Sequence, residues 1–300
     1  MKLGLYPGCS LKGGSREYKE SFAALAKAFD IEFSEIPDWS CCGATAAHNL
    51  NYELSLSLPA RIMALAEKEG MEEIVVPCAA CYCRLSVTQY ELNKDENLRK
   101  NISGIIQMEY KGTVKILNII QMLQKYIVKP LPEKIQKPFN YKVACYYGCL
   151  LVRPHEILKF DRPEDPQTMD ILMKEIGAEP IDWAYKTECC GAGMSVSRTD
   201  LVAKLSGNIM KDAVDRGAEA IIVACPMCHS NLDMRRPEIN KYLAQKIDIP
   251  VIYISQALGV AVGIDNTTLG LHRHFVPVHL PEREKAPDKK QVEPAQMEEK

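Results

Sequence analysis

The sequence lacks the features of exported, membrane-spanning and nucleic-acid-binding proteins. Its first residues have no long apolar core of a secretory signal, and the longest weakly polar run, roughly 254–264, is too short to span a bilayer. The net charge is -2, so no basic surface field would attract nucleic acid or anionic lipid. We therefore expect a soluble, cytoplasmic protein.

Two cofactor motifs are also missing. There is no glycine-rich dinucleotide fingerprint and no C-x2-C-x2-C-x3-C-P run of the kind that holds ordinary four-iron clusters. A flavin and cubane iron–sulfur clusters would therefore belong to other proteins. Cysteine, by contrast, is abundant, with 12 in 300 residues. Because a reducing cytosol would not keep disulfides, metal ligation explains this number better.

Ten of the 12 cysteines form two copies of one pattern, C…CC…CxxC. The gap before the cysteine pair is 31 residues in the first copy and 39 in the second, and the gap after it is 35 and 34 residues. The first quintet is Cys9, Cys41, Cys42, Cys78 and Cys81, and the second is Cys149, Cys189, Cys190, Cys225 and Cys228. Each half of the chain thus carries one five-cysteine site.

Five cysteines in one site indicate a metal cluster. The peptide bond between adjacent cysteines holds their side chains in directions that crowd a single tetrahedral ion, whereas different metals of a cluster accept them separately. Zinc takes four ligands and would leave a fifth thiolate without a role in each half. A thiolate that bridges irons explains the fifth ligand and predicts an unusual, opened cluster. Structural zinc stays as the alternative.

The pattern of apolar residues predicts strands that alternate with helices in both halves. In the first half we expect strands at 2–6, 31–36 and 74–77, and helices at 17–29, 52–70, 79–92 and 112–126. In the second half we expect strands at 141–147, 178–183 and 220–224, and helices at 166–176 and 200–216. Prolines between 129 and 138 are expected to interrupt regular structure and to mark a domain boundary.

The two halves match element by element, and Trp39 and Trp183 each precede a cysteine pair. A repeat of about 140 residues indicates duplication. We predict an α/β fold of two similar, doubly wound parallel-sheet (Rossmann-like) domains, residues 1–135 and 140–265, with a disordered charged tail at 281–300. Ligands of such sheets gather beyond the carboxyl ends of the strands, where all ten cysteines fall and where helix N-termini offer N–H groups to sulfur.

These motifs carry a resemblance to a known family. The pattern is similar to the cysteine-rich CCG domain family, and two tandem copies without a ferredoxin motif resemble the B subunit of heterodisulfide reductase. The resemblance spans residue 1 to about 263, and the segment Tyr146-Tyr147-Gly148-Cys149-Leu150-Leu151-Val152-Arg153-Pro154 is similar to the family signature beyond the cysteines. The gap from Cys190 to Cys225 is one residue shorter than the usual pattern, which a loop deletion explains.

The resemblance implies two noncubane [4Fe-4S] clusters, one on each quintet. It further implies a catalytic subunit that reduces a disulfide held between the clusters, because cleavage takes two electrons and each cluster supplies one while an open iron captures a departing thiolate. Electrons would come from the ferredoxin-like iron–sulfur protein of such a complex, its C subunit, and through it from a flavoprotein, its A subunit. In methanogen members the substrate is the mixed disulfide of coenzymes M and B, and a bacterial relative would act on another disulfide, including a protein-borne one.

Several residues outside the quintets have both a functional and an ordinary interpretation. Cys83 and Cys145 have no counterpart in the other repeat, so each is expected to be a buried apolar residue or a spare thiol. His229 completes a C-x-x-C-H haem signature, but the first repeat has Tyr82 there.

Four polar residues near the expected ligands are candidates for contacts to substrate. His48 and His155 would donate protons to product thiolates, or have surface or structural roles. Arg153 and Arg198 would pair with an anionic substrate or with the anionic clusters.

A second class of function also fits the cysteine pattern. CCG domains resemble parts of lactate- and glycolate-oxidising complexes, in which they would transfer electrons without a disulfide substrate. The missing ferredoxin motif favours the reductase over this alternative.

Overall fold

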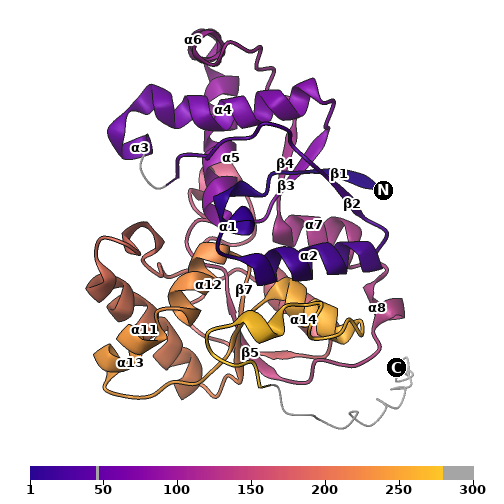
Figure 1. The fold of residues 1–300 in the computed structure, drawn as a ribbon, viewed down its shortest axis with the longest axis vertical. Coiled ribbons are helices and arrows are strands. Elements are labelled where there is room, and N and C mark those ends of the chain that lie inside the picture. The colour runs from indigo at the N-terminus through magenta and orange to yellow at the C-terminus, as the bar shows by residue number, and fades with distance from the viewer. Residues whose placement is uncertain (45–46, 280–300) are drawn as a thin grey trace, which may run out of the picture.

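The computed structural model describes residues 1–44 and 47–279, and the tail predicted at 281–300 lies outside the described residues. The described chain contains two four-stranded parallel sheets, with strand orders β2-β1-β3-β4 and β6-β5-β7-β8 (Figure 1). In both sheets the first strand of the repeat lies between the second and the third, as in doubly wound folds. The predicted fold class, two similar parallel-sheet α/β repeats, is confirmed.

The first repeat has four strands, each of four residues: β1 (Lys2–Leu5), β2 (Glu32–Glu35), β3 (Glu73–Val76) and β4 (Lys115–Asn118). Its helices are α1 (Gly8–Lys12), α2 (Arg16–Ala28), α3 (Ala47–Leu50), α4 (Tyr52–Lys68), α5 (Ala79–Lys94), α6 (Glu96–Ile106) and α7 (Ile119–Tyr126), with the short α8 (Leu131–Lys134) leading into the second repeat.

The second repeat has the strands β5 (Lys142–Tyr146), β6 (Glu179–Pro180), β7 (Ala220–Val223) and β8 (Val251–Tyr253). Its helices are α9 (His155–Leu158), α10 (Thr168–Glu175), α11 (Thr199–Asp215), α12 (Pro226–Asp233), α13 (Arg236–Leu243) and α14 (Ile254–Ala261), with the 3-10 turns η1 (Ala192–Met194) and η2 (Leu271–Arg273). Among the described residues, no helix is long and apolar enough to cross a membrane.

One predicted helix was wrong. The segment 112–126 was expected to be helical throughout, but it contains β4 followed by α7. Its run of apolar residues fits both the two-residue period of a strand and the 3.6-residue period of a helix, because β4 and α7 follow each other without a polar break. The boundary is set by Asn118, whose side chain accepts from the Gln121 N–H while the Gln121 side chain accepts from the Asn118 N–H. This capping box was present in the sequence as Asn-x-x-Gln.

Two further expectations needed correction. The second strand of the second repeat was expected at 178–183, but β6 covers Glu179–Pro180 alone, at the edge of its sheet. The N–H groups of Glu179 and Ile181, on either side of Pro180, donate to the Tyr141 and Val143 carbonyls of β5 and its approach. The prolines between 129 and 138 do not interrupt all regular structure, because Pro130 begins the one-turn helix α8.

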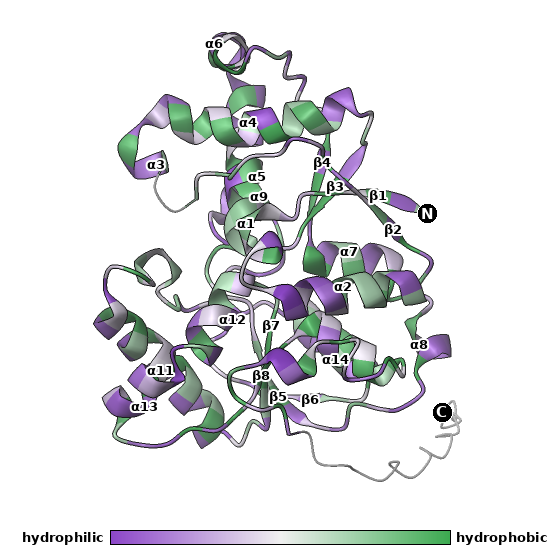
Figure 2. Ribbon diagram, viewed as in Figure 1, coloured by the Kyte–Doolittle hydropathy of each residue, from purple (hydrophilic) through white to green (hydrophobic). Residues whose placement is uncertain are grey.

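The two repeats pack against each other through equivalent elements. Helix α2 of the first repeat packs on α14 of the second (Figure 1), and α10 of the second packs on α7 of the first. Tyr18 on α2 stacks on Tyr253 with ring centroids 4.1 Å apart. Apolar side chains of both halves form one continuous buried cluster, and apolar colouring runs along the inner strands (Figure 2). The packing therefore joins the two halves of the chain, and the domain boundaries at 1–135 and 140–265 stay a prediction.

Candidate metal centres at the two cysteine quintets

The first quintet gathers beyond the carboxyl ends of β1, β2 and β3. Cys9 lies in α1, Cys41 and Cys42 follow β2, and Cys78 and Cys81 begin α5. The Sγ atoms of Cys42 and Cys81 are 3.2 Å apart, and Cys9 and Cys78 lie close enough to shift the pKa of Cys41 and of Cys81, respectively. Cys9 and Cys41 are exposed, whereas the other three are buried. The site therefore has a buried inner side and an outer side open to solvent.

The second quintet repeats this arrangement. Cys149 follows β5, Cys189 and Cys190 follow β6, and Cys225 and Cys228 begin α12. The Sγ atoms of Cys190 and Cys228 are 3.7 Å apart, and Cys149 is hydrogen-bonded to Cys189. Cys189 is exposed and Cys149 is partly exposed. The structure thus brings together each set of five that the sequence pattern predicted, and their role as metal ligands stays a prediction.

A glycine follows each cysteine pair because the chain must turn back toward the sulfur there. Gly43 and Gly191 have φ of 74° and 82°, in the left-handed region that glycine adopts without a steric cost. This turn directs the Gly43 N–H to Cys41 Sγ at 3.4 Å and the Gly191 N–H to Cys189 Sγ at 3.3 Å. Such N–H groups stabilise a thiolate. In the second repeat, the interaction with the Cys149 thiol, together with the N–H groups of Gly191 and Ala192, lowers the pKa of Cys189 to about 6.

A second glycine in each repeat makes room for a sulfur. Gly8 and Gly148 precede the first cysteine of each quintet and have φ of 62° and 70°. A Cβ at Gly8 would lie 3.3 Å from Cys81 Sγ, and a Cβ at Gly148 would lie 2.9 Å from Cys228 Sγ. A larger residue at Gly148 would therefore displace Cys228, and one at Gly8 would crowd Cys81.

A buried tyrosine is hydrogen-bonded to the residue that precedes each cysteine pair. The Tyr6 hydroxyl donates to the Ser40 carbonyl at 2.9 Å, and the Tyr146 hydroxyl donates to the Glu188 carbonyl at 2.6 Å. Burial raises the pKa of both tyrosines, which keeps their hydroxyls protonated as donors. Tyr6 packs edge-on against Trp39, and Tyr146 lies against Trp183, so the two tryptophans noted in the sequence complete the same support.

The two quintets meet at the junction of the repeats. The thiols of Cys78 and Cys225, each at the start of its CxxC helix, lie close enough for each to shift the pKa of the other. Hydrogen bonds from Cys228 and Cys78, and from the N–H groups of Cys228 and Ala79, lower the pKa of Cys225 well below its usual value. One donor is therefore a backbone N–H of the opposite repeat. The two candidate centres are neighbours with a shared boundary.

One residue holds this boundary together. The Tyr18 hydroxyl lies 3.3 Å from the Pro77 carbonyl and 3.2 Å from the Ala224 carbonyl, and these are the residues directly before the two CxxC motifs. Tyr18 is fully buried. It fixes the spacing between the two helix starts that carry Cys78 and Cys225. Sequence reasoning missed it, because nothing local marks a tyrosine on α2 as a bridge between repeats.

The donor set fits a multi-iron cluster. Each site offers five sulfurs, one more than a tetrahedral ion takes, together with backbone N–H groups directed at sulfur. Gly8 and Gly148 leave the space that the sulfurs of Cys81 and Cys228 occupy.

The side chains of the four polar candidates have partners other than these sulfurs, or face solvent. Within residues 1–44 and 47–279, no hydrogen bond joins His48, His155, Arg153 or Arg198 to a sulfur of either quintet. His48 and His155 are exposed. Arg153 donates to the Thr187 carbonyl and pairs with Glu164 at 2.9 Å, and Arg198 pairs with its neighbour Asp200 at 2.8 Å. Any role of these four residues toward substrate stays a prediction.

The remaining cysteines and the haem-like histidine are buried. Cys145 lies in β5, and Cys83 lies on α5, where its thiol donates to the Arg153 carbonyl at 3.6 Å. His229 packs between Tyr253 and His274 rather than at the surface. Sequence reasoning did not foresee this environment, because both partners of His229 come from later segments of the chain.

The fold and site define a duplicated α/β protein with a cysteine-rich centre in each repeat. A family model described as a cysteine-rich domain, CCG, matches residues 3–86 and 143–233. The chain therefore belongs to the CCG cysteine-rich domain family, as the resemblance predicted.

Relatives match along almost the whole chain. The membrane anchor subunit of 8-methylmenaquinol:fumarate reductase from Wolinella succinogenes is 30% identical over 92% of this chain and 97% of its own length. The B subunit of a ferredoxin/F420H2-dependent CoB-CoM heterodisulfide reductase from Methanosarcina acetivorans is also 30% identical, over 92% of this chain and 94% of its own.

A solved structure shares the fold. A hypothetical protein from Helicobacter pylori superposes with a TM-score of 0.75 at 12% identity and covers 93% of this chain. This chain spans about half, 52%, of that protein. At this identity the likeness supports the fold alone.

Proposed function

We propose that this chain is the catalytic subunit of a heterodisulfide-reductase-like complex, with one noncubane [4Fe-4S] cluster on each cysteine quintet. The observation that carries the proposal is the contact between Cys78 and Cys225, which makes the two centres neighbours. The similarity to the B subunit of heterodisulfide reductases supports the same conclusion.

The reaction would be R–S–S–R′ + 2 e⁻ + 2 H⁺ → R–SH + R′–SH. The two clusters, when bound, would supply one electron each and an iron site for each sulfur. A disulfide would approach from the solvent side, where Cys9, Cys41 and Cys189 are exposed. The buried cysteines and the two tyrosine-supported turns would hold the inner side rigid. Electrons would arrive from an iron–sulfur partner, the C subunit of such a complex, and through it from a flavoprotein, the A subunit.

Two cysteine variants test this function. If each centre takes one half of the disulfide, loss of either centre stops the reaction after one electron. Cys42→Ala and Cys190→Ala should therefore each lose more than about nine-tenths of wild-type turnover. This loss corresponds to about 1.4 kcal/mol of transition-state stabilisation. We would measure anaerobic, dye-dependent disulfide reduction, after confirming that each variant keeps its fold and its remaining iron. Cys83→Ala is the matched control, because Cys83 is buried but belongs to neither quintet. A variant that keeps more than a tenth of wild-type turnover contradicts the two-centre reaction.

A second function is favoured by one specific relative. The similarity to a fumarate reductase subunit suggests a chain that only passes electrons between partners. Such a relay predicts asymmetry in the same experiment: the centre nearest the electron donor would be indispensable, and the other would be dispensable for reduction of a small disulfide. Iron and sulfide analysis first separates both functions from a zinc scaffold, because two four-iron clusters give about eight irons per chain.

A further inference from the structure

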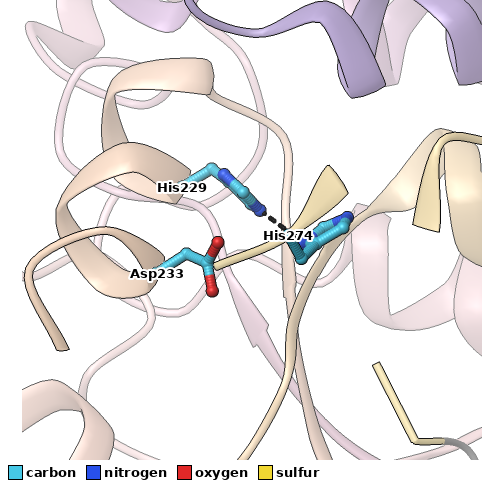
Figure 3. A group of neighbouring side chains, drawn as sticks. All are labelled: His229, Asp233 and His274. Atoms are coloured by element: carbon cyan, nitrogen blue, oxygen red, sulfur yellow. Dashed lines mark hydrogen bonds between the residues drawn. The ribbon is translucent and has the colours of Figure 1, made fainter. Parts of the chain in front are cut away.

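A second group of metal-ligating side chains lies outside the cysteine quintets. His229 and Asp233 lie one helical turn apart on α12, and His274 comes from the segment that follows η2. All three are buried, with exposed fractions of 4%, 1% and 8%. Their ligand atoms all lie within 4.8 Å of one another, and the two imidazole rings meet edge to face beside the carboxylate (Figure 3).

We propose that His229 Nε2, His274 Nδ1 and the Asp233 carboxylate bind one divalent transition-metal ion, of the zinc or ferrous iron class, separate from the two cysteine centres. Two imidazoles and one carboxylate form a common ligand set for both ions. The two ring nitrogens are 3.0 Å apart. Two nitrogens on a tetrahedral zinc ion, each at about 2.0–2.1 Å, are roughly 3.4 Å apart, so a small opening of the pair admits the ion.

Outer groups orient two of the ligands as metal sites require. Glu17 Oε1 lies 3.9 Å from His229 Nδ1, on the side of the ring opposite the site. His229 Nε2 also lies 3.1 Å from the Val251 carbonyl oxygen, so metal binding would replace this contact, and the ring proton would then lie on Nδ1, on the side of Glu17. The Asp233 oxygens accept from the N–H groups of Phe275 at 2.8 Å and Val276 at 3.1 Å, which fixes the carboxylate beside the histidines.

The charge balance of the site calls for a cation. Glu17 and Asp233 are both buried, and within the described part of the chain neither forms an ion pair with a lysine or arginine. The guanidinium of the nearby Arg236 is directed instead to the carbonyls of Leu232, Ile247 and Ile249. Burial raises the pKa of both carboxyls. A divalent ion would add to the partial compensation that Arg236 gives Asp233 and that the Tyr253 hydroxyl gives Glu17.

A cavity provides an open coordination position. Glu17, His229 and Asp233 line a cavity of about 310 Å³ together with Arg273 and Phe275. A water molecule bound to the ion on this side would complete four-fold coordination. The ion would also tie the segment at 274–276 to α12, the helix that carries Cys228.

The competing explanation is a metal-free hydrogen bond between the histidines. Gln256 distinguishes the metal-bound from the metal-free site. Its Oε1 accepts from the Tyr253 N–H, so its Nε2, which lies 2.8 Å from His274 Nε2, acts as a donor to that ring nitrogen. Without metal, His274 therefore carries its proton on Nδ1 and donates it to His229. Metal binding moves this proton to Nε2, where it needs an acceptor. Gln256→Glu offers oxygens both to Tyr253 and to a protonated His274 Nε2, and it gives up the hydrogen bond from Gln256 Nε2 to the Leu269 carbonyl at 3.1 Å.

Zinc binding tests the proposal on the anaerobically reconstituted full chain. After one equivalent of zinc chloride and gel filtration, we expect about one zinc per chain in the wild type, with iron and sulfide unchanged. His274→Ala should lose this zinc, and His272→Ala, an exposed neighbour, should retain it. Equal zinc in the wild type and His274→Ala, or no zinc above trace in the wild type, would overturn the proposal.

A second measurement keeps the test decisive if His274→Ala fails to fold. In competition with a chelator, Gln256→Glu should bind zinc about 10-fold more tightly than the wild type. Unchanged or weaker zinc affinity would instead show that the histidines form only a structural hydrogen bond. Because iron and sulfide report on the cysteine centres, failure here would be distinct from failure of the proposed function.

Discussion

Replacing Gly148 with alanine tests whether this glycine makes room for a cluster ligand. Its φ of 70° alone costs an alanine about 1–2 kcal/mol. The added Cβ would also lie 2.9 Å from Cys228 Sγ, closer than real Cβ contacts. Gly217 is the matched control, because its φ is 78° and a Cβ there meets nothing within 4 Å. Both variants carry the same backbone cost, but only Gly148→Ala displaces a sulfur.

Two measurements separate these effects. Urea unfolding of the metal-free protein should show a loss of about 1–2 kcal/mol in Gly217→Ala and at least as much in Gly148→Ala. After anaerobic reconstitution, Gly148→Ala should retain about half of the wild-type iron and sulfide, whereas Gly217→Ala should retain all of it. The equivalent Gly8→Ala should lose less iron, because its Cβ would lie 3.3 Å from Cys81 Sγ. Full iron in Gly148→Ala would refute the idea that this glycine accommodates a ligand.

Three further predictions follow from the packing around the centres. Cys83→Ala and Cys145→Ala should leave the iron content unchanged by elemental analysis, and a loss of several irons would show that the ligands were assigned wrongly. Tyr18→Phe should destabilise the protein by about 1–3 kcal/mol in urea unfolding, because the buried carbonyls of Pro77 and Ala224 lose their donor; an unchanged midpoint would contradict its bridging role. Lys186→Met should cost about 3–5 kcal/mol, because it leaves the buried Asp170, 3.1 Å from Lys186 Nζ, without its cation. The exposed pair of Lys142 and Glu179 is the control, and Lys142→Met should cost less than about 1 kcal/mol.

Local patterns in the sequence determined much of this protein. The spacing of ten cysteines predicted two quintets, and the alternation of apolar segments predicted two parallel-sheet repeats, because both signals depend on residues that are close in the chain. The glycine after each cysteine pair is a local feature whose role appears only in the structure, where Gly43 and Gly191 form left-handed turns. Where the local signal was ambiguous, as at 112–126, the prediction failed, although the capping pair Asn118 and Gln121 marked the true helix start.

Tertiary structure alone decided how the two repeats face each other. Cys78 and Cys225 are far apart in the sequence, and their contact depends on the packing of α2 on α14 and of α10 on α7. The same packing places Tyr18 between the two CxxC motifs. His274 reaches His229 and Asp233 only because the chain after α14 folds back over α12. A sequence pattern records which side chains a segment presents, but the meeting of distant segments is determined by the burial of apolar surface across the whole chain.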